Sequence, residues 1–197
     1  MTPDRLLHFA RYACAAAALL TSVPALAEAE IDADEYAVLA GFLSGGPPVD
    51  RAAFPPDFAD AWRARIVDRH TGVRRELDAG ALRVLHRDLG DVEPAMLEDY
   101  RARSAMAAAV PKRLQEHGVR VRDDDAELPG VEPRERPSLS FGTLRFSRVG
   151  FNPARDRALF HVYLVGGGPS LGYFVAMTKA EGKWLLRKAA LTEYIIH

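Results

Sequence analysis

Residues 142–184 read GTLRFSRVGFNPARDRALFHVYLVGGGPSLGYFVAMTKAEGKW and hold the densest apolar and aromatic runs of the 197-residue chain. Turn signals cut these runs at residues 152–156, 166–170 and 181–182, where Asn, Pro, Gly and Asp gather. Connections this short join antiparallel strands, because a parallel crossover needs about a dozen residues or more. The stretch therefore predicts an antiparallel β-meander of about four strands.

Side-chain alternation supports the central strand of this meander. Successive residues of a strand face opposite sides of the sheet. Here Ala158, Phe160, Val162 and Leu164 make one wholly apolar face, and the intervening residues make a mixed face that contains His161. The apolar face requires a cover, and the earlier part of the chain supplies candidates for it.

The segments before the sheet favour helices. Apolar residues recur at helical spacing in residues 31–43, 78–89 and 94–109, and Asp32, Asp78 and Pro94 suit the first positions of these helices. Pro111 must end or kink the third helix. We expect an α+β fold with amino-terminal helices packed on the carboxy-terminal sheet, in one domain over residues 28–197 with a long loop near 123–140.

The first 27 residues have the plan of a secretory signal peptide. A polar start with Arg5 and Arg11 precedes an apolar run, and Ala25 and Ala27 form an A-x-A cleavage site. The alternative, a membrane helix, would need about 20 apolar residues, and this run is shorter. We therefore predict an exported protein that is periplasmic or secreted, with no stable membrane span after cleavage.

Removal of this segment leaves about 170 residues, a usual size for one domain. The single cysteine, Cys14, is lost with it, so the mature chain has no disulfide. Without Arg5, Arg11 and Asp4, the 26 basic and 27 acidic residues become 24 and 26, a balance that indicates no nucleic-acid partner. Catalytic and phosphate-binding motifs are missing and no histidine pair has ligand spacing, so we expect no metal and no cofactor.

Three sequence runs resemble a family of exported bacterial proteins with no assigned activity. They are S-R-V-G-F-N at 147–152, the Gly-rich turn that leads into Gly172 and Tyr173, and G-K-W at 182–184. Many members of that family place cysteines around the Gly-rich turn, where this chain has none. The resemblance implies the fold and export, and it implies no catalytic residues.

Four residues of the predicted sheet are candidates for ligand binding: Arg148, Asn152, His161 and Tyr173. A buried Arg148 needs a partner, because an unpaired buried charge is costly. It either binds an anion in a pocket or ties the sheet to a helix, through Glu35, Glu98 or Asp99, and we favour the second reading. His161 more often packs in such a strand than acts as a base.

The first strand of the meander changes parity in its middle. Leu144 and Phe146 share one face of a regular strand, whereas Val149 and Phe151 share the other. A bulge near residues 147–148 would turn all four side chains toward the helices. The alternative is a sheet that is covered on both faces and needs no bulge.

Two functions from different classes stay open. The first is a non-catalytic exported protein that binds a small molecule or an envelope partner. The alternative is a small enzyme, a hydrolase or isomerase, with a pocket between helices and a curved sheet, by analogy with nuclear-transport-factor-2-like domains. An enclosed pocket of several hundred cubic ångströms with Arg148, His161 or Tyr173 converging in it would distinguish ligand binding or catalysis from a surface-mediated interaction.

Overall fold

The computed structural model describes residues 29–45, 66–71, 76–90, 92–122, 142–165 and 170–195. The signal peptide with its cleavage site at Ala25 and Ala27, the long loop near 123–140 and residues 166–169 of the Gly-rich turn lie outside these ranges. The sequence interpretations of those segments therefore stay predictions.

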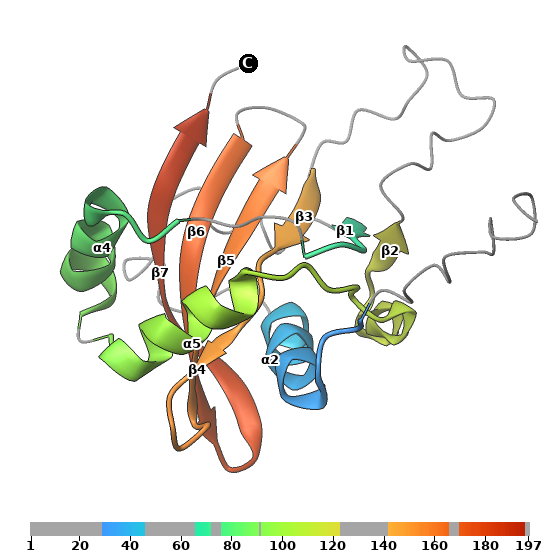
Figure 1. The fold of residues 1–197 in the computed structure, drawn as a ribbon. Helices are drawn as coiled ribbons and strands as arrows, with labels where there is room; N and C mark the ends of the chain where they lie inside the picture. The colour runs from blue at the N-terminus through green and yellow to red at the C-terminus, as the bar shows by residue number, and fades with distance from the viewer. Residues whose placement is uncertain are drawn as a thin grey trace, which may run out of the picture.

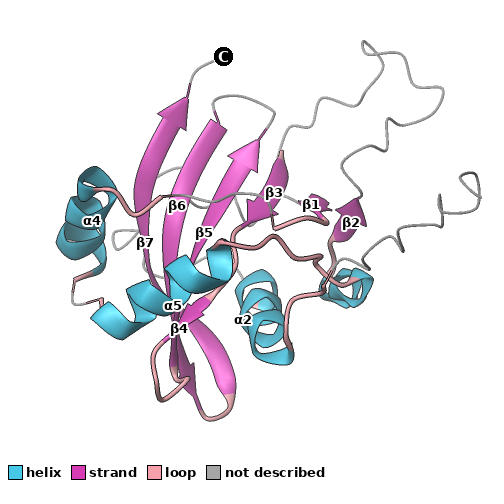
Figure 2. Cartoon of the chain, in the orientation of Figure 1, coloured by secondary structure: helices cyan, strands magenta, loops and turns pink. Residues whose placement is uncertain are grey.

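A mixed sheet forms the centre of an α+β fold (Figures 1 and 2). Its strand order is β2-β1-β3-β5-β6-β7, and the short β4 also pairs with β5. The pairs β3–β5, β5–β6 and β6–β7 are antiparallel, which confirms the meander. The strands are β1 (Ile66–Asp68), β2 (Arg120–Arg122), β3 (Thr143–Phe146), β4 (Gly150–Phe151), β5 (Arg157–Val165), β6 (Ser170–Ala180) and β7 (Lys183–Ile195).

The prediction that everything before the meander is helical cover is wrong at two places. The β1 strand pairs in parallel with both β2 and β3, so two short segments from earlier in the chain widen the sheet. Val67 of β1 is fully buried, and Val121 of β2 is 8% exposed. The short connections of the meander restrict only consecutive strands, and they say nothing about pairing with distant segments.

The helices begin where the sequence predicts. The α2 helix (Ala33–Ser44) has a capping box: Asp32 Oδ1 accepts from Glu35 N–H, and Glu35 Oε2 accepts from Asp32 N–H. Asp78 caps α4 (Ala79–Val84), which continues as the π-helix η4 (Leu85–Leu89), and α5 (Pro94–Ser104) has its proline at the start. A 3₁₀ helix, η5 (Lys112–His117), follows.

The α5 helix ends earlier than predicted. It stops at Ser104 and does not continue through the alanines to Ala109. The Ala109 N–H donates to Ala29 O at 2.9 Å, and Ala109 O accepts from Ile31 N–H at 3.0 Å. These buried backbone groups bond to Ala29 and Ile31, which are distant in sequence, so tertiary hydrogen bonds replace the helical ones.

Helices cover both faces of the sheet. On one face, Phe42 of α2 packs edge-on against Phe146 and Phe160, with ring centroids 5.9 and 5.4 Å apart. On the other face, Tyr100 of α5 packs edge-on against Phe174 at 5.6 Å. The apolar face of β5 is thus the α2 face, and its mixed face lies beneath α5 and α4.

Two glycines allow the helices to approach the sheet closely. A Cβ atom at Gly150 of β4 would lie 2.5 Å from the backbone nitrogen of Tyr100. A Cβ atom at Gly41 of α2 would lie 2.7 Å from Cβ of Trp184 in β7. Glycine is required where backbone or Cβ atoms come this near.

The predicted bulge is present between β3 and β4. Phe146 pairs with Val162 and Gly150 pairs with Leu159, so three residues of one segment lie opposite two of β5. One extra residue is therefore accommodated. As predicted, Leu144, Phe146, Val149 and Phe151 all lie in the core that contains α2. The bulge and the cover on both faces occur together, although either one alone could explain the parity change.

Candidate functional site

Arg148 lies in the segment between β3 and β4, which we call the β3–β4 junction (residues 147–149). Its Nε and Nη2 atoms donate to the two carboxylate oxygens of Glu35 at 2.8 and 2.7 Å. The Glu35 side chain is fully buried, and it also accepts from Val149 N–H at 3.0 Å. A bidentate pair of this kind fixes orientation as well as charge. The structural reading of Arg148, with Glu35 as its partner, is confirmed.

A second arginine extends this network from α5. Arg103 Nη1 lies 2.7 Å from Asp32 Oδ2 and 3.5 Å from Glu35, and its Nε donates to Asp99 at 3.0 Å. Asp99 in turn accepts from Phe151 N–H at 2.8 Å. The network therefore joins α2, α5 and the β3–β4 junction.

The contact between Asp32 and Arg103 affects the pKa of Asp32. Partial burial tends to raise this pKa, but the hydrogen bond and the charge of Arg103 and the N–H groups of Glu35 and Asp34 lower it below its ordinary value of 3.8. The charged form of Asp32 is thus favoured in the folded protein.

Asn152 holds the turn after β4. Its Oδ1 accepts from the N–H groups of Asp156 and Arg157 at 3.1 and 3.0 Å, and its Nδ2 donates to Asp156 Oδ1 at 2.8 Å. This is the side-chain to backbone bonding that favours Asn in turns. The side chain is 6% exposed and stabilises the β4–β5 connection.

His161 and Tyr173 are both fully buried, and they lie on opposite faces of the sheet. His161 packs against Phe174, whereas Tyr173 belongs to the core under α2. His161 Nε2 lies 3.1 Å from Thr192 Oγ1, and that hydroxyl donates to Gly172 O at 3.0 Å.

The four candidate residues are therefore not brought together. Arg148 binds a carboxylate of its own chain, Asn152 holds a turn, and the two rings lie on separate faces. A pocket in which Arg148, His161 or Tyr173 converge, which would favour ligand binding or catalysis at these residues, is not formed by them.

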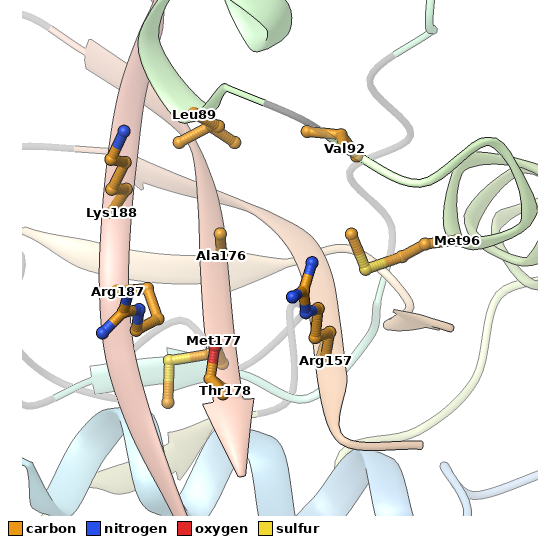
Figure 3. Close-up of a pocket in the computed structure, with 10 residues that line it drawn as sticks. Leu89, Val92, Met96, Arg157, Ala176, Met177, Thr178, Arg187 and Lys188 are labelled. Atoms are coloured by element: carbon orange, nitrogen blue, oxygen red, sulfur yellow. The ribbon is translucent and has the colours of Figure 1, made fainter. Parts of the chain in front are cut away.

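A different site lies on the α5 face of the sheet. It is an open groove of about 490 Å³ between η4, the start of α5 and strands β5 to β7 (Figure 3). Figure 3 shows Arg157 and Lys188 on either side of Ala176, with Leu89 and Val92 above the strands. We call this site the β7 groove; its described lining residues are Leu89, Val92, Met96, Arg157, Ala158, Ala176, Met177, Thr178, Arg187 and Lys188.

The β7 groove combines apolar side chains with three exposed cations. Leu89, Val92 and Met96 are 4–9% exposed. The cations are exposed: Arg157 begins β5, and Arg187 and Lys188 lie within β7. Their positions follow from the register, because Arg157 pairs with Thr178 and Lys188 pairs with Ala176, and paired residues share a face.

The three cations differ in their partners. Arg157 Nη1 lies 3.3 Å from Glu93, a half-exposed pair. The Arg87 hydrogen bond, helped by the charges of Arg87 and Lys188, holds the pKa of Asp88 below its ordinary value against the effect of burial. Lys188 thus interacts electrostatically with the Asp88 carboxylate. Arg187 makes no ion pair with the described residues.

Arg187 owes its place to a second bulge. Ala176 pairs with Lys188 and Met177 pairs with Leu186, which leaves Arg187 as the extra residue of β7. Sequence reasoning missed this groove because its residues come from η4, α5 and three strands. The available signal was the K-W-L-L-R-K run at 183–188, where two adjacent cations break the strand alternation.

Among the described residues, no cluster of three or more His, Cys, Asp or Glu side chains could hold a metal ion. No helix within the described ranges is long and apolar enough to cross a membrane. No protein-family model, curated protein or solved structure matches this chain, so its resemblance to exported bacterial proteins rests on the sequence runs alone.

Proposed function

We propose that this chain is an exported, non-catalytic bacterial protein, periplasmic or secreted, that binds a small molecule in the β7 groove. The observation that carries the proposal is the combination of buried apolar side chains and exposed cations around one concave site. Small-molecule sites are concave, mostly apolar and contain a few polar groups that fix orientation, in volumes of about 300–1,000 Å³. The groove has these properties.

Export is supported by the three-part plan of residues 1–27. The alternative partner is an envelope protein, which would bind at the same edge of the sheet, beside strand β7. Intact-mass analysis of material from the producing host tests export: the expected chain begins at Glu28, and a chain that retains residues 1–27 would refute it.

Native mass spectrometry of the mature protein, purified from its own host, tests binding. We expect a retained small molecule in the wild type and its loss in Thr178→Trp, because Thr178 lines the groove and lies on the same face as Ala176. The control is Arg120→Trp, which places the same ring on β2 at the opposite edge of the sheet. Retention of the same molecule in Thr178→Trp would place binding elsewhere.

A further inference from the structure

We infer that the ligand of the β7 groove is a single-chain amphiphile with an anionic headgroup, a carboxylate or a phosphate, on an alkyl chain. This inference rests on the proposed function and adds the chemical class of the ligand. Two properties of the groove support it: an arginine that makes no ion pair with the described residues, and an apolar wall that continues beyond the groove.

The charged part of the argument concerns Arg187. Arg157 forms an ion pair with Glu93, and the positive charge of Lys188 helps to lower the pKa of Asp88. Arg187 has no ion pair with the described residues, and it is exposed. It is the extra residue of a bulge, so its side chain does not follow the regular alternation of the strand. An arginine in this position can hold the two oxygens of a carboxylate or phosphate in a planar fork.

The apolar part concerns the wall opposite the cations. Leu89 of η4, Val92 of the connection that follows it and Met96 of α5 line the groove together with Ala176 of β6. Leu185 pairs with Thr178 in the register, so it lies on the same face beside the groove, and it is 51% exposed. A chain that lies along these side chains removes apolar surface from water on both itself and the protein.

The two parts together exclude simpler ligands. An inorganic anion would leave the exposed Leu185 uncovered, and a neutral apolar molecule would leave Arg187 without a counter-charge. The shared chemistry has two possible sources, a free single-chain amphiphile or the headgroups of a lipid surface. A groove of about 490 Å³ favours the free molecule, because a bilayer presents its chains away from the protein.

Isothermal titration calorimetry with defined probes, each below its micelle concentration, tests the class of ligand. We expect octyl phosphate and octanoate to bind, and inorganic phosphate, octyl glucoside and octyltrimethylammonium to bind at least tenfold more weakly. Each methylene added between butyl and octyl phosphate should tighten binding by up to about fourfold. Raised salt should weaken the anionic probes, because exposed charges are screened.

Arg187→Gln should weaken octyl phosphate by about tenfold or more, the loss expected for hydrogen bonds to a charged group. Arg120→Gln is the matched control and should change binding less than twofold. Equal urea midpoints for the two variants and the wild type would show that folding is unaffected, as expected for an exposed arginine that makes no ion pair with the described residues.

Several outcomes would overturn the inference. Equal binding of octyl glucoside removes the headgroup argument, and equal binding of inorganic phosphate removes the chain argument. Binding only to vesicles of phosphatidylglycerol would indicate a lipid surface. A neutral or cationic molecule that is retained from the host and displaced by Thr178→Trp would leave the proposed function standing while this inference fails.

Discussion

The β3–β4 junction and the β7 groove both gather arginines at a bulge, but the two regions use them differently. At the junction, Arg148 is 13% exposed, and its Nε and Nη2 atoms donate to the carboxylate of Glu35. In the groove, Arg187 is exposed and makes no ion pair with the described residues. A bulge re-aims a side chain in both cases. The junction uses that direction for the fold, and the groove leaves it available for a ligand.

This contrast also explains the most recognisable run of the sequence. In S-R-V-G-F-N, Ser147 Oγ accepts from His161 N–H at 2.8 Å, where a regular strand would offer a backbone carbonyl. Arg148 binds Glu35, Gly150 makes room for Tyr100, and Asn152 holds the following turn. Each residue has a structural role, so prominence in the sequence here indicates folding and not chemistry.

The largest effect is expected from Glu35→Ala. This change leaves Arg148 without its carboxylate and removes the acceptor of Val149 N–H, so the free energy of unfolding should fall by about 3–5 kcal/mol. Urea denaturation of the mature protein measures it. Asp34→Ala is the control, because the pair of Asp34 with Arg155 is half exposed and should contribute less than about 1 kcal/mol. Similar losses in the two variants would break the comparison.

A smaller loss is expected from Gly150→Ala. The added methyl group would meet the backbone of Tyr100 at 2.5 Å, so α5 must move away from β4. Overpacking of this kind costs about 1–3 kcal/mol. Thermal unfolding followed by circular dichroism measures the change. An unchanged midpoint would mean that α5 can shift at little cost and that the junction does not fix its position.

The smallest effect is expected from Asp32→Asn, and it depends on pH. The folded pKa of Asp32 lies below 3.8, so its contribution is complete above that value and is lost as the pH falls through the folded pKa. Asn keeps the helix cap, so only the charge is removed. The wild type should be more stable by less than about 1 kcal/mol at neutral pH, because the pair is partly exposed to solvent.

Urea titrations between about pH 6 and pH 3 measure this difference. The two stability curves should converge at the acid end, where Asp32 becomes protonated in the wild type as well. A difference that stays constant across the range would show that Arg103 gains nothing from the charge of Asp32.

Local patterns predicted much of the fold. The turn signals at residues 152–156 and 181–182, the alternation around Phe160 and the caps at Asp32 and Asp78 depend only on neighbouring residues, and the structure confirms them. The parity change around Arg148 predicted the bulge for the same reason. The early end of α5 was missed, because the alanines before Pro111 favour a helix locally and the competing hydrogen bonds come from residues distant in sequence, such as Ala29, Ile31 and Thr71.

The sequence by itself determined the strands of the meander, the starts of the helices and the need of Arg148 for a buried partner, since these follow from side-chain period, turn chemistry and the cost of an unpaired charge. Only the tertiary structure decided that β1 and β2 join the sheet, because strand pairing between distant segments leaves no local signal. It also decided the β7 groove, since Leu89, Met96 and Arg187 come from separate elements and meet only when η4 and α5 pack on one face of the sheet.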